Sequence, residues 1–254
     1  MRSAIADSLV IMKRNLLRFP RAPELLTGYT IQPVMFILLF VYVFGGAIRT
    51  PGYDYVDFLM PGILVQTISF GGFLTAVGLT EDMNKGLIDR FRSLPMARSA
   101  VVMGRTLADV VVNCLSLVLM IAVGLIVGFS FSAGAGEVAL GILLLLLFGY
   151  AFSWIFALLG LFTKSVETAQ SLGFIAVFPL TFISSAFVPV ESMPAALKAF
   201  AQVNPFTITV DAERALFLGA PAHNSVWGAF AWSLGLIAVF APLAVRRYRR
   251  VSAR

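Results

Sequence analysis

The residues with the clearest capacity for function lie in the stretch 81–98, which mixes charged and apolar side chains. Leu87, Phe91 and Leu94 follow one another at intervals of four and three, which places them on one face of a short helix. Pro95 would end that helix, because proline has no N–H and disfavours helix at the residue before it. The charged residues that project away from that face are Asp89, Arg90 and Arg92. Such a helix can fill a groove on a cytosolic partner; the alternative is a solvated loop.

Hydrolytic chemistry lacks its usual residues in this chain. His223 is the single histidine, and neither an HExxH motif nor a Cys/His cluster typical of a metal site occurs in the sequence. The phosphate-binding pattern GxxxxGK[ST] is also missing, so any role driven by ATP requires a separate ATPase chain.

The composition indicates that most of the chain lies in lipid. Only 13% of the 254 residues are charged and the mean hydropathy is +0.91, whereas soluble domains carry roughly 25% charged residues. We therefore predict an all-α integral membrane protein with six transmembrane helices, since each crossing needs about 20 apolar residues. The predicted spans are residues 28–48, 58–80, 106–129, 138–162, 169–188 and 225–245.

The basic residues orient these spans. Sixteen of the 19 lysine and arginine residues fall in the N-terminal tail, the loops after the second and fourth spans, and the C-terminal tail. This asymmetry predicts that both termini lie in the cytoplasm, with a membrane domain over 28–245 and a basic tail over 246–254. It also explains the net charge of +6 without nucleic-acid binding.

Polar residues inside the predicted spans are few. Each could bond a neighbouring helix or contact a cargo. They are Gln32, Gln66, Thr67, Asn113, Ser116, Ser153, Gln170, Thr181, Ser184 and Ser185. Asp109 is expected to reach the membrane interface from a span end. We therefore expect no acidic side chain in the middle of the membrane, which argues against a proton-coupled or ion-coupled carrier.

Residues 1–27 precede the first predicted span and have an amphipathic pattern. The apolar residues Ile5, Leu9, Met12, Leu16 and Phe19 recur at intervals of three and four, which predicts an amphipathic helix. We expect this helix to lie in the membrane interface with its basic side toward the lipid head groups. The alternative is a cytosolic helix that packs on the rest of the protein.

The segment 189–224 between the last two predicted spans is broken by prolines at positions 189, 194 and 205. Irregular backbone at membrane depth persists only where protein or water satisfies its polar groups. The segment could therefore form short re-entrant helices on the outer side, and the alternative is an ordinary extracellular loop.

Two runs of residues carry a family resemblance. The stretch from Lys85 to Arg98 resembles the signature that follows the second span in permeases of type-2 ABC exporters, and it is most similar to the daunorubicin/doxorubicin-resistance permeases. The resemblance implies that the loop 81–105 holds a coupling helix that docks on the ATPase subunit. The coupling residues that it implies are Lys85, Leu87, Asp89, Arg90, Phe91, Arg92, Leu94, Pro95 and Arg98.

The second run lies in the outer segment. The sequence Phe187-Val-Pro189-Val-Glu191-Ser-Met193-Pro194, followed by Asn204-Pro205 and by Asp211 with Arg214, is similar to the same family's Pro-x-x-x-Met-Pro, Asn-Pro and Asp-x-x-Arg pattern. This resemblance favours the re-entrant arrangement of residues 189–224.

Phenylalanines repeat every four residues along the first and fifth predicted spans. In the family these spans lie near the dimer interface, so the stripes could line an apolar substrate path, although lipid-facing or core positions are the better explanation for each residue taken alone. The candidate path residues are Phe36, Phe40, Gln66, Phe174, Phe178, Phe182 and Ser185.

Together these features predict a multi-pass permease of a bacterial cell membrane that exports a hydrophobic or amphipathic compound such as a drug, polyketide or lipid. The resemblance implies a second permease copy or paralogue and two ABC ATPase subunits, which would bind ATP and Mg; this chain itself needs no cofactor or metal. The nearest alternative is export of a polysaccharide or lipid-linked glycan. More distant alternatives are a lipid-modifying membrane enzyme, for which no polar catalytic cluster is found, and a scaffold.

Overall fold

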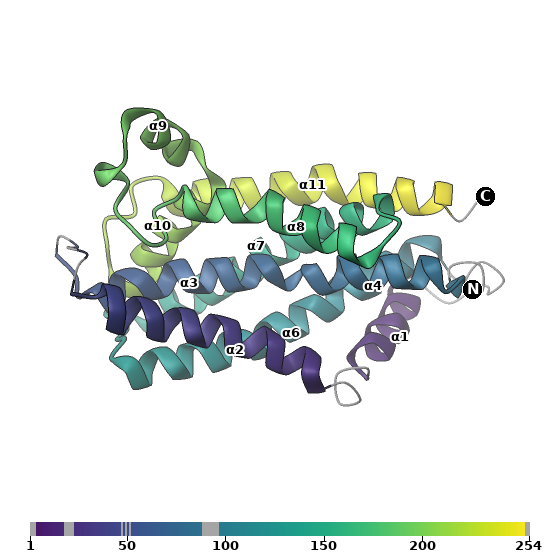
Figure 1. Cartoon of the computed structure of the whole chain (residues 1–254), viewed down its shortest axis with the longest axis horizontal. Helices are drawn as coiled ribbons and strands as arrows, with labels where there is room; N and C mark the ends of the chain where they lie inside the picture. The colour runs from purple at the N-terminus through teal and green to yellow at the C-terminus, as the bar shows by residue number, and fades with distance from the viewer. Residues whose placement is uncertain are drawn as a thin grey trace.

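A computed structural model describes residues 4–17, 23–46, 48, 50, 52–87 and 97–251, and every regular element among them is a helix. Figure 1 shows long helices that run side by side as a bundle. The elements are α1 (Ala4–Leu16), α2 (Pro23–Leu39), η2 (Phe40–Phe44), α3 (Tyr55–Gly71), α4 (Phe73–Asn84), α6 (Arg98–Val127), α7 (Ala135–Phe162), α8 (Val166–Phe182), η3 (Val190–Ser192), α9 (Ala195–Val203), α10 (Pro205–Leu218) and α11 (Ser225–Val251).

Four helical segments of the described chain are long and apolar enough to cross a membrane. They are Tyr55–Asn84, Ser99–Val127, Ala135–Phe162 and Ser225–Val251. Two shorter apolar helices, Ile31–Phe44 and Val166–Phe182, overlap the remaining predicted spans. The prediction of an all-helical membrane fold is confirmed, whereas the count of six spans and their orientation stay predictions.

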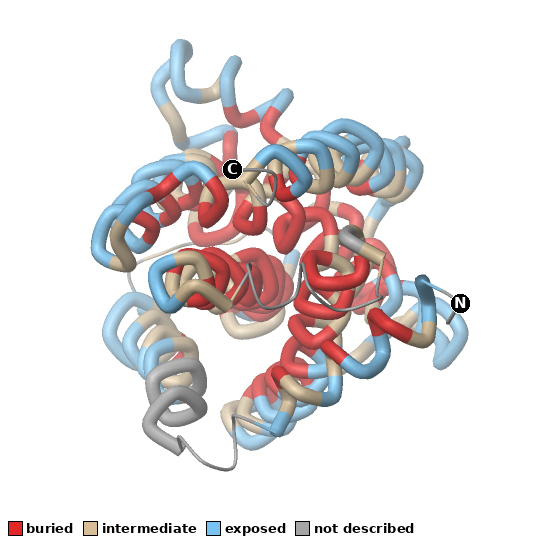
Figure 2. Tube along the Cα trace, turned by 90° about the vertical axis from the view of Figure 1, so that its right-hand side faces the viewer, coloured by how far each residue is buried: buried red, intermediate tan, exposed pale blue. Residues whose placement is uncertain are grey.

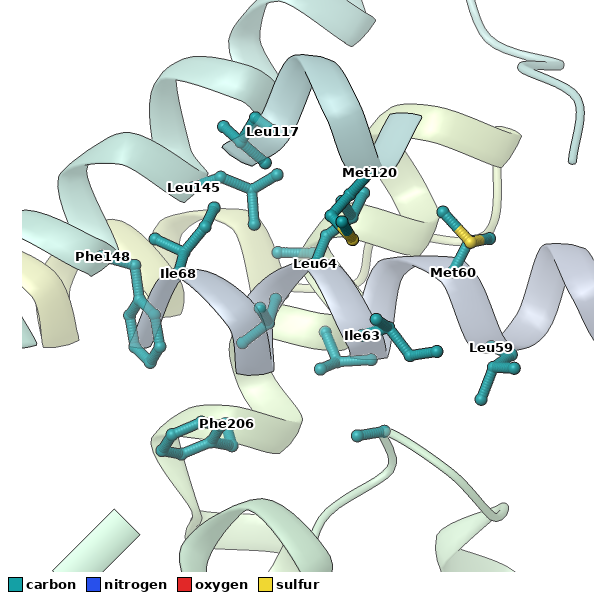
Figure 3. Close-up of a cluster of buried hydrophobic side chains, with 14 of the residues drawn as sticks. Leu59, Met60, Ile63, Leu64, Ile68, Leu117, Met120, Leu145, Phe148 and Phe206 are labelled. Carbon is teal, nitrogen blue, oxygen red and sulfur yellow. The ribbon is translucent and has the colours of Figure 1, made fainter. Parts of the chain in front are cut away.

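The segment formed by α3 and α4 runs through the centre of the bundle (Figures 1 and 2). In its most apolar window 78% of the residues are buried, compared with 17% for α11. Because α3 is apolar on all sides, it is stable only when other helices surround it. Figure 3 shows side chains of α6, α7 and α10 around it; the labelled residues on these helices are Leu117, Met120, Leu145, Phe148 and Phe206.

Glycines let neighbouring backbones approach the central segment closely. The α3–α4 segment is interrupted at Gly72, where an added Cβ would lie 2.7 Å from the Cα of Ser153 in α7. One turn further along α4 and two turns further along α7, a Cβ on Gly160 would lie 2.5 Å from the carbonyl oxygen of Ala76. Small residues of this kind allow close packing of helices in membranes.

Several helices continue past the ends of the predicted spans. The α4 helix reaches Asn84, α6 begins at Arg98, and α11 continues to Val251. The spans were bounded by the loss of apolar character, but charged residues such as arginine and glutamate have high helix propensity and prolong a helix. The loop predicted over 81–105 is correspondingly shorter, and the tail assigned to 246–254 begins as helix.

The N-terminal helix packs on α6 through its more polar face. Asp7, Ser8, Ile11 and Asn15 are buried, whereas the predicted apolar stripe is turned outward, with Ile5 69% and Leu9 48% exposed. The basic residue Arg14 contacts protein rather than projecting outward. Arg14 was expected to face the lipid head groups, and this is wrong because its guanidinium pairs with the buried carboxylate of Asp82. Contact of the outward apolar stripe of α1 with lipid stays a prediction.

Two substitutions in α7 test the close approach of α4 and α7. Gly160→Ala forces a Cβ against the Ala76 carbonyl and should lower the free energy of unfolding by about 1–3 kcal/mol, the usual range for overpacking. Gly136→Ala is the matched control, because its Cβ meets nothing within 4 Å. The melting temperatures of both variants are measured in detergent, with unfolding monitored by fluorescence-detected size-exclusion chromatography. Equal melting temperatures would contradict the packing described.

Candidate functional site

A buried ion-pair cluster lies near the C-terminal end of the central segment, at Asp82 of α4. The Oδ2 atom of Asp82, on α4, accepts hydrogen bonds from Nη2 of Arg105 at 2.9 Å and from Nη2 of Arg14 at 3.1 Å. Gly78 makes room for the Arg105 guanidinium, which a Cβ at that position would overlap. We call Arg14, Asp82 and Arg105 the inner clamp, since it joins α1, α4 and α6.

The N-terminal helix α1 also contacts the residue that precedes α6. The backbone N–H of Ala97, which precedes α6, donates to Oδ2 of Asp7 at 3.1 Å. The helix α1 therefore contacts α4 through Arg14 and Asp82, and it contacts the start of α6 through Asp7 and Ala97.

The structure describes two of the predicted coupling side chains. Lys85 is exposed and pairs with Glu81 at 3.2 Å, and Leu87 is half-buried. The other predicted residues lie outside the described part of the chain, or, for Arg98, have only their backbone described; they are Asp89, Arg90, Phe91, Arg92, Leu94, Pro95 and Arg98. The coupling helix itself stays a prediction.

The two predicted phenylalanine stripes form one continuous row of ring contacts. Ring centroids along α8 are 4.6 Å apart for Phe174 and Phe178 and 4.2 Å apart for Phe178 and Phe182. Phe187 joins this stripe to the one on α2 and η2, with its ring centroid 5.0 Å from that of Phe182 and 4.7 Å from that of Phe40. We call the set the aromatic ladder; its members are Phe36, Phe40, Phe174, Phe178, Phe182 and Phe187.

The ladder is partly open to its surroundings. Phe174 is 45% exposed, and the neighbouring rings along α8 are half-buried. Phe187, which is buried, was not predicted as a path residue, although it opens the proline-rich motif of the outer segment. The other two candidates lie elsewhere: Gln66 is buried within α3, and Ser185 donates a hydrogen bond to Asp211 at 2.8 Å.

The Asn-Pro pair explains how the outer segment is fixed. The Asn204 side chain caps α10 by accepting from the N–H of Phe206 at 2.9 Å, and Pro205 occupies the first position of the helix. The Nδ2 group of Asn204 donates to the carbonyls of Leu180 and Ile183, each at 2.7 Å. One residue thus starts α10 and joins it to the end of α8.

The Asp-x-x-Arg pair fixes α10 to the central segment. The buried guanidinium of Arg214 donates to the carbonyls of Phe58 and Ser185 and pairs with Asp211 at 3.0 Å. It also lies 3.7 Å above the ring centroid of Phe58. We call Arg214 and these partners the outer anchor, and it borders a cavity of about 410 Å³ that also contacts Tyr53 and Glu191.

Comparisons with known proteins agree with this arrangement. Residues 7–218 match the model of the family described as ABC-2 type transporter. The chain is 35% identical to the daunorubicin resistance ABC transporter permease protein DrrB1 of Streptomyces coeruleorubidus, over 99% of this chain and 89% of that protein. It is 24% identical to the probable doxorubicin resistance ABC transporter permease protein DrrC of Mycobacterium tuberculosis (strain ATCC 25618 / H37Rv), over 98% and 90% of the two chains.

The similarity extends to a putative transport permease, ycf38, of Cyanophora paradoxa. It is 27% identical over 87% of this chain and 76% of that protein. The matched family region ends at the last residue of α10, so it contains the inner clamp, the aromatic ladder and the outer anchor.

Removing the charge of Asp82 tests the inner clamp. Asp82→Asn leaves the Arg105 guanidinium buried without its carboxylate, which should lower the free energy of unfolding by about 3–5 kcal/mol. Glu81→Gln is the matched control, because its partner Lys85 is largely exposed and exposed pairs contribute about 0–1 kcal/mol. Thermal melting of the purified proteins should separate the two variants clearly, and similar melting temperatures would contradict the clamp.

Proposed function

The chain belongs to the ABC-2 type transporter family, and on that basis we propose that it exports a hydrophobic or amphipathic compound of the drug-resistance type. As a family member it is the multi-pass membrane permease of a transporter, and ATP hydrolysis takes place on a partner ATPase. The observation that carries the proposal is the 35% identity to a daunorubicin resistance permease over 99% of this chain.

We propose a six-span topology with both termini in the cytoplasm of a bacterial cell. The start of α1 and the end of α11 lie at one end of the bundle, and α9 lies at the other (Figure 1). The 17 residues of α8 are about 25 Å long at 1.5 Å per residue, which is at the lower limit for a crossing. In this orientation α9 and α10 are the re-entrant helices on the outer side.

Coupling would begin at residues 85–98. Two ATPase subunits that close on ATP and Mg would push on this stretch, where Phe91 is the proposed apolar anchor. Because the inner clamp joins α1, α4 and α6, the push would move these three helices as one unit. Since α4 continues into α3, the movement would reach the outer anchor at Phe58.

The aromatic ladder is the proposed contact surface for the cargo. Its half-exposed rings on α2 and α8 offer a continuous apolar face with little charge. A second permease copy or a paralogue facing this surface would enclose a path between the two chains. Planar apolar compounds would stack on its rings.

Mutation of the predicted coupling face tests the proposed function. Phe91→Asp combined with Leu94→Asp places two carboxylates on the docking face, and we expect the permease to lose its ATPase during purification in detergent. The matched control is Leu197→Asp with Phe200→Asp, the same pair of changes on exposed residues of α9. If the first variant keeps its ATPase and its drug-stimulated ATP turnover, the coupling proposal fails.

Truncation of the ladder tests the cargo path. Phe178→Ala removes the ring that stacks on both Phe174 and Phe182. An aromatic pair contributes about 0.5–1.5 kcal/mol, so the apparent affinity for a planar aromatic drug should fall by about two- to tenfold. Drug-dependent ATP turnover in lipid vesicles measures this effect, with Trp227→Ala as a control because Trp227 is an exposed aromatic outside the ladder. An unchanged affinity would remove the ladder from the path.

A further inference from the structure

The cavity beside the outer anchor lies at the end of the bundle that carries α9 (Figure 1). It has a volume of about 410 Å³, and segments far apart in the chain line it: the start of α3, the turn after α8, η3, α9, α10 and the start of α11. Cavities of about 300–1,000 Å³ typically hold small organic molecules. This cavity is therefore large enough for an aromatic ring with a polar side group.

Apolar and aromatic side chains line part of the cavity. They are Tyr53, Phe58, Pro189, Val190 and Ile208. The ring of Phe58 is buried, and the guanidinium of Arg214 lies 3.7 Å above its centroid. Tyr53, in contrast, is only half-buried. The ring of Tyr53 is thus the aromatic surface of the lining that a ligand can reach.

Two carboxylates line the same cavity. Glu191 of η3 is exposed and forms no ion pair with the residues that the structure describes. Asp211 of α10 accepts hydrogen bonds from Ser185 at 2.8 Å and from Arg214 at 3.0 Å, both through Oδ1. Its Oδ2 atom accepts no hydrogen bond from the described residues, and 46% of the side chain is exposed. Each acid therefore keeps carboxylate oxygens that a ligand can contact.

The positive charge of Arg214 is already used within the protein. Its guanidinium donates to the carbonyls of Phe58 and Ser185 and to the carboxylate of Asp211, and its side chain is 8% exposed. An anion in the cavity would therefore find few of its N–H groups available. Because the described lining holds two carboxylates and one arginine, it carries a net charge of −1. This balance repels an anion and attracts a cation.

The volume and the apolar lining favour an organic cation over a metal ion. A hard cation such as Ca²⁺ takes about six to eight oxygen ligands, more than two carboxylates beside apolar side chains provide. The ammonium group of an organic molecule instead donates hydrogen bonds to carboxylates, while the carbon skeleton covers apolar surface. An aromatic ring beside the carboxylates adds a cation–π contact. Tyr53, Asp211 and Glu191 supply this combination.

We propose that this cavity binds the ammonium group of an organic cation, with Asp211 and Glu191 as its charge partners and Tyr53 as its aromatic contact. An amine-bearing cargo and the head group of an aminophospholipid both present this chemistry. The inference goes beyond the proposed exporter function, which assigns the cargo to the aromatic ladder and no ligand to the cavity. Binding can be measured on the permease alone, so its failure is distinguishable from failure of the exporter function.

Fluorine NMR of the purified full-length permease in detergent tests the site, with para-fluorobenzylammonium as the probe. The probe should bind saturably, because its ammonium group meets the two carboxylates and its ring meets Tyr53. Neutral para-fluorobenzyl alcohol has nearly the same shape without the charge, and it should bind more weakly by about two- to fivefold or more. Equal binding of the cation and the alcohol would overturn the proposal.

Glu191 is exposed and lies outside the outer anchor, so its substitution tests the site without disturbing the fold. Glu191→Gln should weaken binding of the cation by about two- to fivefold. Glu191→Lys adds a positive charge to the lining and should weaken binding further. The matched controls are Asp54→Asn and Asp54→Lys, because Asp54 is an exposed acid next to Tyr53 in the chain but is not among the described residues that line the cavity. Equal effects at the two positions would reveal only a general effect of charge and would overturn the site.

The aromatic contact is tested at Tyr53. Tyr53→Leu should weaken binding of the cation by about two- to fivefold, whereas Tyr53→Phe should preserve it, because a cation–π contact needs the ring and not the hydroxyl. Unchanged binding in Tyr53→Leu would remove the ring from the site and contradict the proposal.

Competition against the bound probe identifies the source of the ammonium group. Displacement by glycerophosphoethanolamine would identify a lipid head group, and displacement by naphthylmethylammonium alone would identify an amine-bearing cargo. Either result supports the proposal. Displacement by neither amine would overturn it, and displacement by calcium alone at constant ionic strength would show a metal site instead, which also overturns it.

Discussion

The Asp82 carboxylate can be buried only because Arg105 and Arg14 reach its Oδ2 atom from two different helices. An unpaired carboxylate at this depth would cost several kcal/mol, so the three helices are held in one arrangement as long as the charge is present. This constraint fixes α1 on the bundle and sets the distance between α4 and α6.

The outer end of the same central segment is held by a different arginine. Arg214 of α10 donates to the carbonyl of Phe58 in α3, and Asn204 joins α10 to the end of α8. The central segment is thus fixed at both ends by charged or polar contacts with other helices. Its helix is interrupted between these ends at Gly72.

The sequence predicted features that repeat locally. Apolar segments of helical length and phenylalanines every four residues can be recognised without knowing the fold, and the Asn-Pro pair carries its own capping geometry. The contacts of Asp82 could not be predicted, because its partners lie 68 and 23 residues away in the chain. The burial of Asp109 could not be predicted for the same reason, because it lies against side chains of other helices. The outward apolar stripe of α1 likewise depends on a buried carboxylate in another helix.

The packing of the bundle limits where a cargo can travel. Along α3 the apolar residues are almost fully buried against α6, α7 and α10, as Figure 3 shows for Ile63 and Leu64. Interiors packed in this way do not admit a drug-sized molecule without separating the helices. The aromatic ladder, in contrast, lies at the edge of the bundle, where Phe174 is 45% exposed. In the two-chain arrangement that we propose, a cargo path along the ladder would require movement of the chains relative to one another rather than opening of this core.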